Sequence, residues 1–167
     1  FEALKTVKLN KNHKPQLLIG HTGLMDLLLS KVEPSIKDNV RKYLIEYDRL
    51  SIEDIDESDK TKFELIQVME CRGETSKVLN TLKSIYGDQE VIEDLMRLFT
   101  QMIPLARSQD IDLQLDPTFQ PHFELYTGLV FQLVCRGAAS PVVIARGGRY
   151  DNLVYKSGEK KDQAAGV

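Results

Sequence analysis

The stretch that decides the fold is PHFELYTGLVFQLVCRGAASPVVIARGGRYDNL, residues 121–153. Apolar side chains alternate along its first part, which predicts a strand over residues 123–135 with Leu125, Leu129, Phe131 and Leu133 on the core side. A run of β-branched and apolar residues predicts a second strand over residues 142–146. We therefore expect a β-hairpin that ends in a Gly-Gly step and leads into a helix.

The other side of the first strand has the character of a pocket floor. It carries a carboxylate, a phenol and a bare backbone position at Glu124, Tyr126 and Gly128. Two adjacent glycines at the end of the second strand let the backbone approach a ligand closely and leave N–H groups facing it. The candidate binding residues are Glu124, Tyr126, Gly128, Gly147, Gly148, Arg149 and Tyr150. A plain hairpin with a glycine bulge and a buried tyrosine is the alternative interpretation.

Two motifs in this stretch, LYTGLVF (125–131) and ARGGRYDNL (145–153), resemble the histidine-specific motifs of histidyl-tRNA synthetases. They resemble still more closely the regulatory subunits of ATP phosphoribosyltransferase, which are catalytically retired paralogues of those synthetases. The synthetase motif has an essential arginine five residues before its second tyrosine, where this sequence has Pro121, and Leu125 replaces a tyrosine common in the family. Without that permanent cation, the acyl-adenylate transition state loses a stabilising charge. The resemblance thus implies a histidine-shaped pocket without aminoacylation.

The resemblance also implies a function and a partner. We expect a non-catalytic regulatory subunit that binds histidine or a related effector and transmits feedback to a separate catalytic ATP phosphoribosyltransferase chain in histidine biosynthesis. Glu124 would hold an imidazole N–H or the α-ammonium group, Tyr126 and Tyr150 would wall the ring, and Arg149 would bind a carboxylate or brace the site through Asp151. No catalytic residue and no cofactor are expected.

Two other functions stay open. The chain would be an enzyme if it were part of a true histidyl-tRNA synthetase that activates histidine with ATP. It would also fit a small α+β domain that retains no ligand. A piece of a synthetase should catalyse ATP–pyrophosphate exchange with histidine, and the other two should not.

Composition narrows the class of protein. The 167 residues carry 22 basic and 25 acidic side chains, so the net charge of −3 gives no electrostatic case for nucleic acid. The two cysteines and three histidines lack metal-ligand spacing, so we expect no metal site. No signal peptide or membrane span is expected, and a reducing cytoplasm is the default location.

The rest of the chain predicts an α+β fold with a largely antiparallel sheet flanked by helices, like the catalytic domain of class II synthetases but incomplete. Further strands are expected at residues 16–20 and 111–115, and residues 35–106 are expected to form a helical insertion between strands. Residues 107–155 would then hold the histidine-motif hairpin and the start of the next helix. Within the insertion, helices are expected over residues 61–71, 75–86 and 89–106, with Pro104 ending or kinking the last one.

The turn after the first strand allows two interpretations. His21 and Thr22 would lie at the edge of the pocket, or Thr22 would cap the following helix while His21 is solvated. Both ends of the sequence resemble interrupted elements, a helix stripe at Phe1, Leu4 and Val7 and a Gly-rich motif at residues 164–167. The missing strands would come from further segments of the chain or from a second protomer, so self-association is expected.

Overall fold

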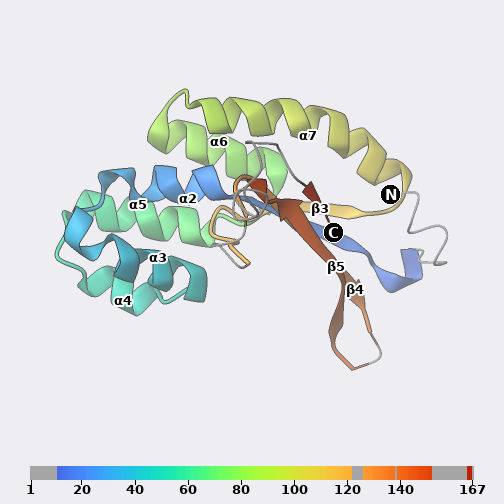
Figure 1. Ribbon diagram of the computed structural model, residues 1–167, viewed down its shortest axis with the longest axis horizontal. Helices are drawn as coiled ribbons and strands as arrows, with labels where there is room; N and C mark the ends of the chain where they lie inside the picture. Colours follow the sequence, from blue (N-terminus) through green and yellow to red (C-terminus); the bar gives the residue numbers. More distant parts are fainter. Residues whose placement is uncertain (1–10, 122–125, 138, 152–164, 167) are drawn as a thin grey trace, which may run out of the picture.

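The computed structural model describes residues 11–121, 126–137, 139–151 and 165–166 (Figure 1). Its strands form one mixed sheet in the order β2-β3-β1-β4-β5-β6. The parallel pair is β1 with β3, and the other neighbours pair antiparallel. The strands are β1 (Gln16–His21), β2 (Gly73–Glu74), β3 (Asp112–Leu115), β4 (Leu129–Arg136), β5 (Pro141–Arg149) and β6 (Ala165–Gly166). The predicted α+β class is confirmed, with a parallel pair that the prediction did not specify.

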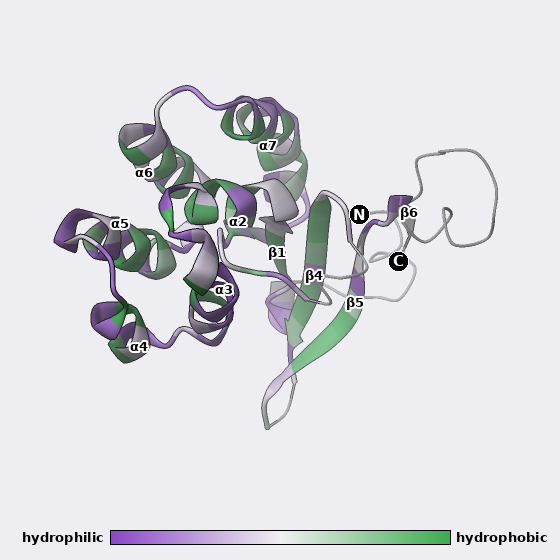
Figure 2. Ribbon diagram, turned by 60° about the vertical axis from the view of Figure 1, so that its left-hand side comes forward, coloured by the Kyte–Doolittle hydropathy of each residue, from purple (hydrophilic) through white to green (hydrophobic). Residues whose placement is uncertain are grey.

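The helices gather on one side of this sheet (Figure 2). These helices are α2 (Thr22–Leu28), η2 (Leu29–Lys31), η3 (Pro34–Ile36), α3 (Lys37–Glu46), α4 (Arg49–Asp54), α5 (Asp59–Glu70), α6 (Thr75–Tyr86) and α7 (Glu90–Ser108). The short η1 (Lys11–His13) precedes β1 and lies apart from them (Figure 1). The expected helices over residues 61–71 and 75–86 correspond to α5 and α6. The last helix continues past Pro104 to Ser108. Strand β2 interrupts the helical run and was not predicted.

The core lies between the helices and the sheet. Apolar stripes supply it at helical spacing from α2, α3, α6 and α7, while β1 and β3 each add residues from one face. Its largest fully buried side chains include Ile19, Leu24, Leu28, Leu44, Leu82, Leu95, Phe99 and Leu115. The helices therefore fix the position of β1, and β1 fixes the position of the hairpin beside it.

The two hairpin strands differ in extent from their predicted bounds. Strand β4 begins at Leu129, which pairs with His21, the last residue of β1. Upstream of Leu129 β1 offers no partner, so Tyr126–Gly128 lie outside β4, although Thr127 still bonds to Arg149. Residues 122–125 lie outside the described residues. Strand β5 runs on to Arg149, because Gly147 and Gly148 pair with β4 instead of stepping out of the sheet.

The far end of the hairpin extends beyond the helices (Figure 1). Leu133 pairs with Ala145 and Val134 with Val143, so Ile144 is the extra residue of a β-bulge. Val142, Val143 and Ile144 are 48%, 41% and 44% exposed. This stretch of β5 is apolar and exposed, and none of the described residues covers it.

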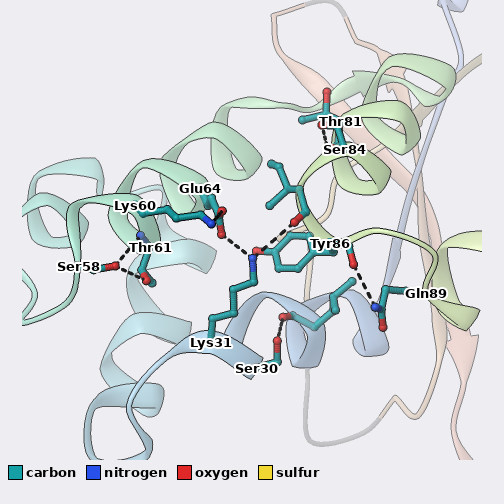
Figure 3. Close-up of polar contacts among 12 residues, drawn as sticks. Ser30, Lys31, Ser58, Lys60, Thr61, Glu64, Thr81, Ser84, Tyr86 and Gln89 are labelled. Atoms are coloured by element: carbon teal, nitrogen blue, oxygen red, sulfur yellow. Dashed lines mark hydrogen bonds and ion pairs between the residues drawn. The ribbon is translucent and has the colours of Figure 1, made fainter.

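A lysine joins three helical segments (Figure 3). Nζ of Lys31 in η2 lies 2.7 Å from Oε2 of Glu64 in α5 and 4.7 Å from the centre of the Tyr86 ring in α6. Burial, with the nearby Glu64 carboxylate, raises the pKa of the Tyr86 phenol above its usual range. The cation thus faces a neutral ring and a carboxylate, which anchors α2 and η2 to the later helices.

Candidate functional site

Three chain segments meet at one end of the sheet, where β1 and β5 end and β4 begins. The N–H of Thr22 donates to the carbonyl oxygen of Gly128 at 3.0 Å, and the N–H of Thr127 donates to that of Arg149 at 2.8 Å. The N–H of Asp151 donates to Oγ1 of Thr127 at 3.0 Å. The register of β1, β4 and β5 therefore brings residues of the two predicted motifs together beside the start of α2.

Tyr126 lies against the bare backbone of Gly148. A Cβ atom added to Gly148 would lie 2.7 Å from Cδ1 of Tyr126 and 2.6 Å from the carbonyl oxygen of Leu129. Only glycine fits under the phenol ring without displacing backbone. Gly147 is buried and pairs with Phe131, and Tyr150 follows directly after β5, half-buried.

Gly128 opens toward a different pair of side chains. A Cβ atom added there would lie 3.4 Å from Cδ of Arg149 and 3.7 Å from Nε2 of His21. Neighbouring residues of a strand send their side chains to opposite sides, so Arg149 and the ring over Gly148 flank the end of β5 from two sides. The prediction that Tyr126 and Gly128 face one pocket floor is therefore wrong, because Tyr126 lies on the Gly148 side of β5 and Gly128 faces the Arg149 side.

Arg149 is held by its neighbour two residues on. Its Nε donates to Oδ2 of Asp151 at 2.7 Å, and this pair is one of the two contacts that the sequence suggested for this arginine. Asp151 is itself fixed by Thr127. Of the seven predicted site residues, Glu124 lies outside the described residues, and the structure brings the other six to this end of the sheet.

His21, not Thr22, caps helix α2. Its Nδ1 accepts a hydrogen bond from the N–H of Gly23 at 3.0 Å, whereas Thr22 is the first helical residue. The predicted cap at Thr22 is thus wrong, and the half-buried His21 is not a solvated side chain. Burial lowers the pKa of His21 below its ordinary value; Asp94 and Asp26 oppose this shift and Arg149 reinforces it.

We expect the ring proton resonances of His21 to titrate with a midpoint below the ordinary pKa of 6.5. The lowered pKa favours the neutral ring in the folded state, so its contribution to stability is present above pH 6.5 and is lost as the pH falls through the folded pKa. NMR titration measures the midpoint. The variant His21→Asn keeps a capping oxygen and should flatten the acid limb of the unfolding free energy. A midpoint at or above 6.5 would contradict this assignment.

The described residues also form a hollow away from this end of the sheet. A hollow of about 740 Å³ lies at the opposite end of the strands, where Lys14, Gln16, Asp112 and Arg136 contribute to its lining. Within the described ranges, no group of three His, Cys, Asp or Glu side chains is placed to hold a metal ion. None of the helices described is both long and apolar enough to cross a membrane.

Comparisons with known proteins match this chain along its whole length. The family model described as "Histidyl-tRNA synthetase" matches residues 1–167. An ATP phosphoribosyltransferase regulatory subunit of Prochlorococcus marinus (strain MIT 9313) is 55% identical over 167 residues, which are 100% of this chain and 43% of that protein. The chain thus spans less than half the length of this curated relative.

Solved structures share the fold. A crystal structure of an ATP phosphoribosyltransferase regulatory subunit/histidyl-tRNA synthetase from Bacillus halodurans superposes with a TM-score of 0.80 at 25% identity, covering 98% of this chain and 43% of that one. A chain of the ATP phosphoribosyl transferase (HisG:HisZ) complex from Thermotoga maritima gives a TM-score of 0.66 at 20% identity, covering 89% and 53%. The predicted class II synthetase-like fold is confirmed.

Proposed function

The chain belongs to the histidyl-tRNA synthetase family, and from this premise we propose that it acts as a non-catalytic regulatory module of ATP phosphoribosyltransferase. It binds histidine or a related effector at the end of the sheet where β1 and β5 end. The observation that carries the proposal is the contact of Tyr126 with Gly148 beside the Arg149–Asp151 pair. An aromatic ring and an oriented guanidinium at the end of one strand suit a zwitterion with a ring.

The residue types around the site favour binding without chemistry. Pro121 offers no charge where a synthetase has its arginine. Arg107 lies in the last turn of α7, and Arg136 lies at the hairpin end of β4, so neither replaces that cation. Aminoacylation needs a preorganised positive charge on the developing oxyanion.

We further propose a catalytic ATP phosphoribosyltransferase chain as the partner. The similar chain from Thermotoga maritima is part of a complex named HisG:HisZ, and the relative from Prochlorococcus carries the name of the regulatory subunit. Effector binding would transmit feedback if the effector binds one state of the complex better than another. Self-association, a cytoplasmic location and a contribution of Glu124 to the site are parts of the same proposal.

Isothermal titration with L-histidine tests the site. We expect Tyr126→Ala and Arg149→Ala to weaken binding by about 10- to 100-fold, as for loss of an aromatic wall or a charge-assisted hydrogen bond. Arg146→Ala is the matched control: this arginine lies on the same strand, is exposed, and bonds Gln132 at 2.8 Å. Equal affinity in all four proteins would reject the site.

ATP–pyrophosphate exchange in the presence of histidine separates the regulatory function from the synthetase function. We expect no exchange above background under the regulatory proposal. Exchange that depends on histidine would favour the synthetase. The absence of any binding heat with histidine, alone or with the catalytic chain, would favour a domain without a ligand.

A further inference from the structure

The side chains of His21 and Arg149 approach Gly128 from two directions. The 3.7 Å and 3.4 Å separations from the absent Cβ leave room for about one methyl-sized group between Nε2 of His21 and Cδ of Arg149. Gly128 itself is buried, and its carbonyl oxygen is held by Thr22. The gap between the imidazole of His21 and the aliphatic part of the Arg149 side chain is therefore bounded by hydrogen-bonded backbone.

The imidazole presents a donor to this gap. Because Nδ1 of His21 accepts the hydrogen bond from Gly23, the neutral ring carries its proton on Nε2. Among the residues that the structure describes, none accepts a hydrogen bond from Nε2. The cap of helix α2 thus fixes both the orientation and the tautomer of His21.

The guanidinium presents further donors. Nε of Arg149 is used by Asp151, which fixes the plane of the group, while its two Nη atoms have no acceptor in the described part of the chain. The side chain is 42% exposed, so a small ligand can reach it. A planar guanidinium held at one edge is prepared to bind a carboxylate.

We propose that His21 and Arg149 together bind the α-carboxylate of the effector, next to Gly128, which places no side chain between them. This inference rests on the proposed function and adds a recognition residue, His21, that the motifs do not contain. Two carboxylates interact electrostatically with His21, and each is paired with an arginine: Asp26 with Arg41 at 3.6 Å, and Asp94 with Arg97. Arg149 thus supplies a positive charge for the carboxylate, which Pro121 cannot do.

Comparison of L-histidine with L-histidinol tests this assignment by isothermal titration on the 167-residue chain. Histidinol carries an alcohol in place of the carboxylate and keeps the imidazole and the amine. We expect histidine to bind at least about 10-fold more tightly than histidinol, as for one charge-assisted contact. Equal binding of both would overturn the carboxylate subsite and leave the effector site standing. Binding of neither would reject the effector site and this subsite together.

Two variants probe the gap directly. Gly128→Ala fills it with a methyl group at ordinary contact distances, and His21→Asn keeps the helix cap but removes the Nε2 donor. Both should bring the affinities for histidine and histidinol to within about 3-fold of each other while unfolding at wild-type temperature. A preference for histidine that survives in both folded variants would overturn the role of His21.

NMR gives a second readout that a purely structural role would not move. The Nε2 resonance of His21 should shift on addition of histidine and stay in place with histidinol. His13, which lies in η1 at the start of the described chain, provides an internal control and should not respond. A His21 resonance that responds equally to both ligands would contradict the proposal.

Discussion

Replacement of Gly20 by alanine is expected to lower the free energy of unfolding by about 3 kcal/mol. Gly20 lies in β1, at the centre of the sheet, where a Cβ atom would sit 2.4 Å from the carbonyl oxygen of Phe119 and 3.1 Å from Cγ2 of Val130. The oxygen belongs to the backbone, so no side-chain rearrangement relieves the contact. Urea unfolding followed by circular dichroism measures the loss.

The matched control for Gly20 is Gly128→Ala, which adds the same methyl group at 3.4 Å from its nearest neighbour. That variant should unfold within about 0.5 kcal/mol of wild type. Adding Val130→Ala to Gly20→Ala should not restore stability, because it leaves the Phe119 oxygen in place. Wild-type stability of Gly20→Ala would show that the chain after β3 is free to move away from β1.

Asp116→Ala is the second large effect, with an expected loss of about 3 kcal/mol. This carboxylate is 2% exposed. One of its oxygens accepts from the hydroxyl of Tyr47, and the other accepts from the N–H and Oγ1 of Thr118, each at 2.9 Å. Thr118 is 1% exposed, so alanine leaves buried donors without an acceptor. Chemical denaturation gives the loss directly.

Tyr47 provides the controls for this network. Burial, and then the bond to Asp116, raises the pKa of its phenol above the ordinary 10.0. The folded state favours the neutral phenol. The contribution of Tyr47 to the free energy of unfolding is therefore present below pH 10 and is lost as the pH rises through the folded pKa. Tyr47→Phe should remove that alkaline loss and should couple to Asp116→Ala in a double-mutant cycle. Additive effects would mean that the two side chains act independently.

The fold could be predicted wherever local pattern decides it. Helices α5 and α6 follow from apolar spacing, and the hairpin follows from alternation on both sides of a turn. Strands β2 and β6 could not be predicted, because each has two residues and exists only through its pairing with a distant strand. Gly147 and Gly148 indicated a step out of the sheet, yet continuous pairing with β4 keeps them in β5.

The candidate site was predictable in composition and not in arrangement. The adjacent glycines in the sequence indicated a close backbone approach at Gly148, and in the structure the ring of Tyr126 lies against that residue. His21 approaches Arg149 because of the register of β1, β4 and β5. That register depends on strand pairing and could not be predicted from the individual residues. A cap at Thr22 was one of two interpretations and rested on residue preference, whereas the backbone places His21 at the N-cap position of α2.

The parallel pairing of β1 with β3 has a kinetic consequence. Gln16 lies opposite Asp112, 96 residues further along the chain. The pairing of β1 with β3 therefore closes a loop that contains all the helices from α2 to α7. Closing so long a loop costs conformational entropy, and the helices can form before that cost is met. Refolding should therefore show helical signal first, and the sheet centre should acquire hydrogen-exchange protection last.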